Sequence, residues 1–222
     1  MGMNATYKGP LDCPVTVPLF PLNGVLLLPR GQMPLNIFEP RYMAMIDDAL
    51  MGHRCIGIIQ PDGEDENAKR PALQKVGCLG RITQFAETGD NRYMLTLTGV
   101  SRFRLAEELS VTTPYRQARA AYEPFLSDFV ARAGEEEVDR RALLAALKSF
   151  AEANELKIDW KGVNDAPNEA LVNALSMMCP FGPREKQALL EAPDLKTRAD
   201  VLIAITEIDL ARGGGDPEAT LQ

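Results

Sequence analysis

In the first half of the chain, apolar and polar positions alternate over short stretches, which is typical of β-strands. Two apolar runs at 16–22 and 25–28 flank Asn23-Gly24, a dipeptide that favours a tight hairpin turn. Apolar residues alternate with polar ones from Tyr93 until Gly99 breaks the run. The pattern predicts about six or seven short strands, over 16–22, 25–28, 34–38, 55–60, 76–85, 93–98 and 116–122.

One helix is predicted among these strands. Pro40 suits its first position, because proline lacks the N–H that would be unpaired there, and Gly52 ends the helical pattern. Residues 61–72 are polar and unpatterned, which predicts an exposed loop. The apolar residues that recur at helical spacing are Tyr42, Met45, Ile46 and Ala49.

The second half has helical periodicity. Glu135, Glu136 and Glu137 place negative charge where a helix start favours it, and apolar residues follow with helical spacing to about Asn154. We expect Trp160 to fill a junction between helices. The remaining helices are predicted over 167–179, 183–192 and 194–211, each bounded by proline.

These elements predict an α+β fold with two units. A β-rich unit over 14–122 forms a small barrel or folded-over sheet of about six strands with one helix, because proline and glycine punctuate every junction. A helical bundle follows over 135–212, with the boundary near 123–134. Residues 1–13 and 213–222 are expected to be flexible ends.

The composition agrees with a globular protein. Hydrophobic residues make up 45% and charged residues 25% of the 222 residues. No apolar run approaches the roughly 20 residues that a membrane-spanning helix needs. The first residues contain no apolar segment of the kind found in a secretory signal, so we expect no membrane association and a cytoplasmic protein.

The charge argues against a nucleic-acid partner. The net charge is −7, and residues 123–222 hold 11 basic against 19 acidic side chains. Residues 14–122 are nearly balanced, with 12 basic and 11 acidic side chains. A nucleic-acid-binding protein usually presents a basic stripe, which this chain lacks, although a local patch in the first half stays open.

No constellation in the sequence predicts catalysis, a metal or a cofactor. His53 is the only histidine and lies in a turn signal, and no glycine is followed by lysine, so a Walker A phosphate loop is absent. Adjacent carboxylates point in different directions, which favours solvated surface charge over an acid–base pair. These carboxylates are Asp47, Asp48, Glu107 and Glu108. The four cysteines are expected to be free thiols; they are Cys13, Cys55, Cys78 and Cys179.

One segment carries a specific resemblance. Residues 17–42 read VPLFPLNGVLLLPRGQMPLNIFEPRY, which closely resembles the opening of the N-terminal domain of Lon proteases. Later segments resemble the same domain, so that the resemblance covers residues 14–212. They are GCLGRI at 77–82, GVSRFRL at 99–105, PYRQA at 114–118 and LVNALSMMCPFGPREKQALLEA at 171–192.

The resemblance implies a PUA-like barrel or sandwich followed by a helical bundle, with the N-terminal region of cereblon as a more distant relative. It implies recognition of polypeptide substrates, or of a protease or chaperone partner. In Lon proteases this domain precedes an ATPase and a peptidase. The present sequence shows neither, so we expect no enzymatic activity from it.

Two sets of residues follow from this interpretation. Those expected to contact a bound polypeptide, together with the loop at 61–72 and a free strand edge, are Met33, Pro34, Leu35, Ile37 and Phe38. Those expected to have structural roles are Glu39, Pro40, Arg41, Tyr42, Arg102 and Phe103. Glu39 is expected to pair with Arg41 or to cap the helix, and Arg102 to extend its guanidinium toward solvent while Phe103 is buried.

The sequence thus favours a non-catalytic protein-binding module. PUA-like folds also occur in RNA-binding proteins, which makes RNA binding the alternative, on fold analogy alone. An unrecognised hydrolase would require two carboxylates converging in a pocket. Self-association is left open.

Overall fold

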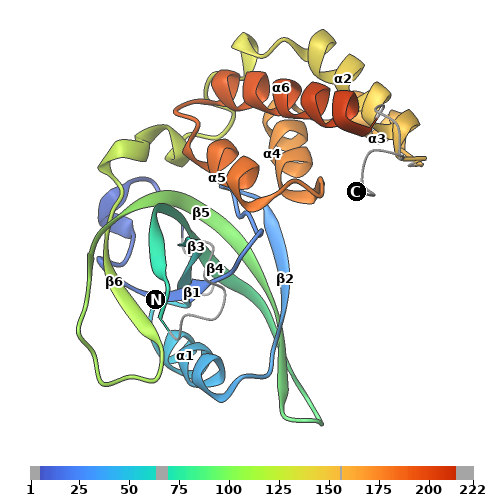
Figure 1. Ribbon diagram of the computed structural model, residues 1–222. Helices are drawn as coiled ribbons and strands as arrows, with labels where there is room; N and C mark the ends of the chain where they lie inside the picture. The colour runs from blue at the N-terminus through green and yellow to red at the C-terminus, as the bar shows by residue number, and fades with distance from the viewer. Residues whose placement is uncertain (1–5, 64–69, 156, 214–222) are drawn as a thin grey trace.

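The computed structural model describes residues 6–63, 70–155 and 157–213. Figure 1 shows a strand unit with one helix at its lower end and a helical unit above it, which confirms the predicted α+β class. The six strands are β1 (Thr16–Pro21), β2 (Gln32–Ile37), β3 (Cys55–Asp62), β4 (Ala72–Thr88), β5 (Arg92–Glu108) and β6 (Arg116–Ala121).

The strands pair in the order β2-β5-β4-β3-β1-β6, and β6 also pairs with β5. This last pairing joins β5, β4, β3, β1 and β6 into a closed ring. β1 runs parallel to β3, and the other pairs are antiparallel. β2 lies outside the ring and pairs only with β5 among the described strands, so it is an edge strand.

The hairpin predicted at Asn23-Gly24 is wrong. β1 pairs with β3 and β6, and residues 25–28 form no strand. The Gly24 N–H donates to the Gln60 side chain, 3.0 Å away, and Leu26, Leu27 and Leu28 are buried. The apolar run is therefore a core-filling connection from β1 to β2, and its side chains are buried without a strand partner.

β4 and β5 are longer than predicted, and Gly99 does not break β5. The pairing of the two strands shifts register between Leu79 and Gly80, opposite Gly99. A β-carbon on Gly99 would lie 2.0 Å from the Leu28 carbonyl oxygen, so the glycine lets the connection from β1 cross directly over β5. The far ends of β4 and β5, together with β2, extend below the ring as a three-stranded ribbon (Figure 1).

The predicted helices form, with two differences. α2 begins at Arg140, where the Asp139 carboxylate caps it, and Glu135–Glu137 instead form a separate 3₁₀ turn. Trp160 opens a short helix and is 38% exposed, so it does not fill a junction. The helices are α1 (Pro40–Met51), α2 (Arg140–Ala153), α3 (Trp160–Asp165), α4 (Asn168–Met178), α5 (Pro183–Glu191) and α6 (Leu195–Gly213), with 3₁₀ helices η1 (Pro10–Asp12), η2 (Glu123–Phe129) and η3 (Glu135–Glu137).

One apolar core passes from the strand unit into the helical unit. It joins Met45 of α1 and Leu97 of β5 to Leu143 of α2 and Leu202 of α6. A smaller cluster forms around Phe103 on the other side of the sheet, and Cys13 is buried in it. Of the ends predicted to be flexible, residues 6–13 therefore pack against the sheet. Residues 1–5 and 214–222 lie outside the described residues, and so does the 64–69 part of the predicted loop.

We predict that Gly99→Ala lowers the free energy of unfolding by about 2 kcal/mol, because the new methyl group overlaps a backbone oxygen that cannot move independently of the core. Gly89→Ala is the matched control, since a β-carbon there meets no atom within 4 Å. Urea unfolding of the two variants checks this. Equal midpoints would contradict the close crossing at Gly99.

Candidate functional site

β2 divides the residues predicted to contact a polypeptide into two groups. Side chains alternate across a strand, so Met33 and Ile37 point into the core and are 7% and 2% exposed. Pro34 is exposed, Leu35 is half-buried and Phe38, just after the strand, is 62% exposed. Of the five, only these three offer side-chain surface to a partner.

The strand register continues this apolar surface onto β4 and β5. Leu35 lies opposite Leu95, which lies opposite Phe85 on β4. On the other face of the ribbon, Asn36 lies opposite Met94, which makes Pro34 and Met94 diagonal neighbours. Phe85 and Met94 are 36% and 56% exposed. Apolar side chains are therefore accessible on both faces of the ribbon, Leu35 and Phe85 on one and Pro34 and Met94 on the other. Together with Phe38, which follows β2, we call these residues the ribbon surface.

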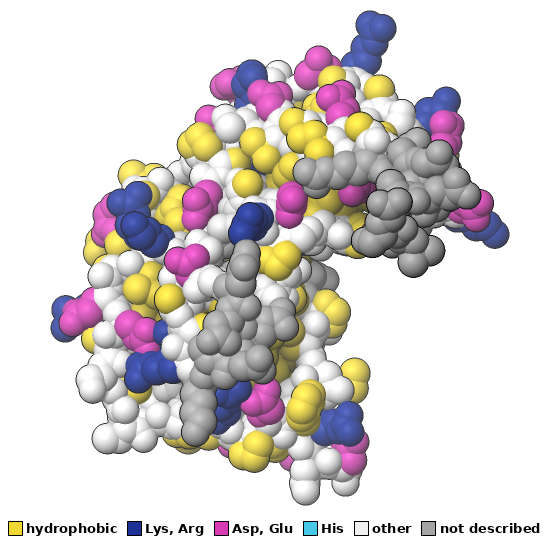
Figure 2. All heavy atoms as spheres, viewed as in Figure 1, with side chains coloured by type: hydrophobic (Ala, Val, Ile, Leu, Met, Phe, Trp, Pro, Cys, Tyr) yellow, Lys and Arg dark blue, Asp and Glu magenta, His cyan; other side chains and the backbone are white. Residues whose placement is uncertain are grey.

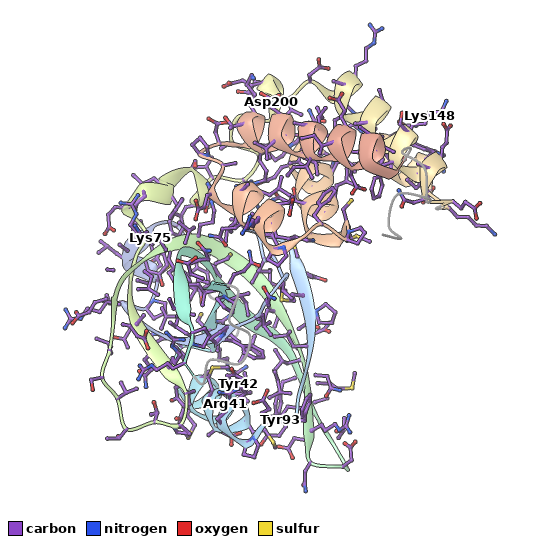
Figure 3. All side chains as sticks on the ribbon, in the orientation of Figure 1. Arg41, Tyr42, Lys75, Tyr93, Lys148 and Asp200 are labelled. Carbon is purple, nitrogen blue, oxygen red and sulfur yellow. The ribbon has the colours of Figure 1, made fainter. Side chains whose placement is uncertain are left out.

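Neighbouring aromatic and charged groups fix the ribbon surface in place. The Tyr93 ring lies 5.0 Å from the Phe85 ring, and its hydroxyl donates to the Asp47 carboxylate of α1 over 3.0 Å. Figure 3 shows Tyr93 beside α1, close to Arg41 and Tyr42. The ribbon end is therefore attached to a helix, and in Figure 2 apolar side chains are exposed at this end of the molecule.

The free edge of β2 is poorly suited to strand addition. Pro34 stands in the middle of the strand and has no N–H to donate. Proline on an edge strand blocks further pairing in many sheets. Contact with a partner is therefore expected through the side chains of the ribbon surface.

The corner between β2 and α1 is structural. Pro40 begins the helix, and the Glu39 side chain makes no capping hydrogen bond. Arg41 Nε instead donates to Glu39 Oε2 over 2.9 Å, and its guanidinium lies 4.5 Å from the Tyr42 ring centroid. The Tyr42 ring packs 4.4 Å from the Phe20 ring of β1, and burial raises the pKa of its hydroxyl. This corner anchors the end of β2 to the core.

The prediction that Arg102 extends its guanidinium toward solvent is wrong. It is 1% exposed, and its Nε and Nη2 donate to the Asp128 carboxylate over 2.9 and 2.8 Å. Nη1 donates to the carbonyls of Leu190 and Ala192 where α5 ends. The guanidinium can be buried because a carboxylate and backbone oxygens satisfy its donors, and it thereby ties β5 to the helical unit.

Phe103, by contrast, is buried as expected. Its ring is fully enclosed, and β-carbons on Gly57 and Gly77 would lie 3.0 and 2.7 Å from it. The two glycines on adjacent strands therefore leave the space that the ring fills.

The adjacent carboxylates do not converge. Asp47 accepts from Tyr93 on β5, and Asp48 accepts from Tyr115, which precedes β6, over 2.5 Å. Glu107 pairs with Arg119 at 3.5 Å, whereas Glu108 pairs with Arg70 and Arg116. The hydrogen bond from Arg116 holds the pKa of Glu108 below its ordinary value. These four carboxylates thus take part in separate ion pairs and hydrogen bonds.

Burial disfavours the thiolate form of the cysteines. Burial raises the pKa of Cys13 to about 12 and also raises the pKa values of Cys55 and Cys78. Within the described ranges, no group of three or more His, Cys, Asp or Glu residues is arranged to hold a metal ion. In the same residues, no helix is both long and apolar enough to cross a membrane.

The comparisons with known proteins agree with this structure. Residues 16–207 match the family described as the ATP-dependent protease La (LON) substrate-binding domain. Lon protease 2 of Myxococcus xanthus is 30% identical over 205 residues, which cover 87% of this chain and 24% of that protein. The chain belongs to the Lon substrate-binding domain family, and it spans about a quarter of the length of the curated Lon proteases it matches.

Two solved structures share the fold. A Lon N-terminal domain protein from Xanthomonas campestris superposes with a TM-score of 0.61 at 21% identity, over 85% of this chain and 97% of that one. The N-terminal domain of a Mycobacterium avium complex Lon protease gives 0.61 at 18% identity, over 86% and 98%. The resemblance first suggested by residues 17–42 is thereby confirmed for the fold and family.

Phe85 and Met94 were not predicted as part of the site. The alternation around Met94 does predict a strand with one exposed face. What the local pattern lacks is any signal that β5 pairs with both β2 and β4. These pairings place Met94 diagonally across from Pro34, and Phe85 one strand beyond Leu95, on the face that Leu35 shares.

We predict that Asp128→Ala lowers the free energy of unfolding by about 3–5 kcal/mol, because it leaves the Arg102 guanidinium buried without its counter-charge. Asp200→Ala is the control: it also removes an ion pair, with Lys196, but both side chains are half exposed, and no measurable change is expected. Equilibrium unfolding in urea checks both. Equal effects would show that the Arg102 pair contributes no more than a surface pair.

Proposed function

We propose that this chain is a non-catalytic protein-binding module that recognises polypeptides with exposed apolar segments through the ribbon surface. The observation that carries the proposal is the exposure of Phe38, Phe85 and Met94 on a ribbon whose position is fixed by α1. Apolar side chains gathered on a rigid surface typically mark a binding site. Membership of the Lon substrate-binding domain family supports a polypeptide as the ligand.

The proposal includes where the chain works and with what. We infer a cytoplasmic role linked to proteolysis, either in delivering polypeptide substrates or in binding a protease or chaperone. Neither ATP hydrolysis nor peptide cleavage belongs to this role. The carboxylates and thiols are engaged or buried, and the net charge of −7 opposes nucleic-acid binding.

A binding experiment with an unfolded protein tests this proposal. The probe is a fluorescein-labelled globular protein that has been reduced and carboxymethylated so that it stays unfolded, with its native form as the competing control. We expect fluorescence anisotropy to show binding of the unfolded form only. Binding of a labelled RNA in preference, with affinity falling steeply with salt, would contradict the proposal.

We predict that replacing Phe38 and Met94 by serine weakens binding of the unfolded protein about tenfold, because two apolar contacts are lost from the interface. Ile208→Ser is the control, since Ile208 is 51% exposed on α6, away from the ribbon. Thermal unfolding verifies that all variants are folded. Equal weakening by the control would place the binding surface elsewhere.

A further inference from the structure

A hollow lies at the opposite end of β2 from Phe38. It has a volume of about 320 Å³ and lies between the residues that lead into β2 and helix α4. Figure 2 shows the outline of the molecule indented on the side of β2, between the helical unit and the ribbon. A volume of a few hundred Å³ is enough to enclose a large apolar side chain.

The wall of the hollow is apolar and adaptable. Ala170, Ala174, Met177 and Met178 line it from α4, and Met178 is 80% exposed. A β-carbon on Gly31 would lie 2.4 Å from the Met177 sulfur, so the glycine lets the chain entering β2 pack closely against α4. Methionine side chains adjust to ligands of varied shape, which suits a site for different apolar residues.

The rim of the hollow presents positive charge. Among the lining residues, two are cationic, Arg30 and Arg132, and one is anionic, Glu169. The Arg30 and Arg132 side chains are 39% and 66% exposed, whereas those of Glu169 and Glu135, with which they pair, are only 13% exposed. The guanidinium side chains are therefore more exposed to solvent than the carboxylates that pair with them.

Hydrogen bonds hold this arrangement in place. Arg30 donates to the Asp128 carbonyl over 2.7 Å and to Glu169 Oε1 over 3.1 Å. Glu169 Oε2 accepts the backbone N–H of Arg132 over 2.9 Å, and the Arg132 guanidinium donates to the Glu135 carboxylate. The cations of the rim are thus set in position before any ligand arrives, on a chain whose overall charge is negative.

We propose that the hollow binds an apolar side chain whose neighbour in the ligand carries a carboxylate. The preferred ligands of this chain are then polypeptides in which an acidic residue adjoins an aliphatic or aromatic one. This inference rests on the proposed function and adds a substrate class to it. β2 joins the hollow to the ribbon surface, and an extended ligand of about six residues is long enough to reach from one to the other.

Three matched peptides test the preference. Each peptide is short, is labelled with fluorescein and carries two leucines. The residue after the leucines is glutamate in the first peptide, glutamine in the second and lysine in the third. We expect the Leu–Glu peptide to bind about fivefold more tightly than the Leu–Lys peptide, with the Leu–Gln peptide between them. Added salt is expected to weaken binding of the Leu–Glu peptide and to reduce the difference in affinity between the Leu–Glu and Leu–Lys peptides.

Substitutions locate the preference. Arg132→Glu is expected to reverse the order of the three binding affinities. The milder Arg132→Gln is expected to make the affinities equal. Lys148→Glu is the matched control, since Lys148 is 67% exposed on α2 (Figure 3) and its reversal changes the net charge equally. Met178→Ser is expected to weaken binding of all three peptides, whereas Ile208→Ser is expected to leave their affinities unchanged. Thermal unfolding of each variant separates a lost contact from a lost fold.

The outcomes distinguish this inference from the proposed function. Equal affinities for the three peptides, or a preference for lysine, overturn the acidic preference even when the unfolded protein binds. The same holds if Lys148→Glu alters the order as much as Arg132→Glu does. If the unfolded protein binds but none of the peptides does, the hollow is not a ligand site. If the unfolded protein does not bind either, the proposed function itself has failed.

Discussion

The ion pair between Arg102 and Asp128 determines how the two units of this molecule sit on each other. Arg102 comes from the middle of β5, Asp128 from the 3₁₀ helix that leaves the sheet, and the carbonyls of Leu190 and Ala192 from the end of α5. A buried guanidinium is tolerated only when all of its surroundings are arranged to accept its hydrogen bonds. Three segments far apart in sequence are therefore held at one point.

The geometry of both candidate binding regions follows from this constraint. The hollow exists because α4 is held beside the chain entering β2, and Arg30 reaches both the Asp128 carbonyl and Glu169 across that junction. The ribbon surface depends on β5, since the same strand carries Met94 near its start and Arg102 further along. The junction thus sets where the hollow and the ribbon lie relative to each other.

Local signals predicted local elements well. α1 begins at Pro40 and ends at Gly52 as expected, because helix boundaries depend on residues within one turn. The Asn23-Gly24 hairpin failed because strand pairing is decided by distant partners, here β3 and β6. The burial of Arg102 could not be predicted for the same reason: its acceptors lie up to 91 positions away.

The residues predicted to contact a polypeptide show the same difference between local signals and distant pairing. The run at Met33–Phe38 was predicted as apolar surface, yet Met33 and Ile37 are buried in the core. Leu35 lies on the same face of β2 but is only half-buried, and Pro34 and Phe38 are exposed. Which residues complete the surface depends on the register of β2 with β5, which sequence patterns do not specify. The family resemblance identified the class of protein, and the structure narrowed the surface.

Methionine methyl groups provide the most direct measurement of the central claim, that this chain binds polypeptides along the side formed by β2. Met94, Met178 and Met51 are 56%, 80% and 80% exposed, on the ribbon, at the hollow and at the far end of α1 respectively. NMR of protein labelled with ¹³C at its methionine methyl groups, titrated with an unfolded protein, should shift the Met94 and Met178 signals and leave the Met51 signal in place. Shifts at Met51 alone, or no shifts at any of the three, would contradict the account.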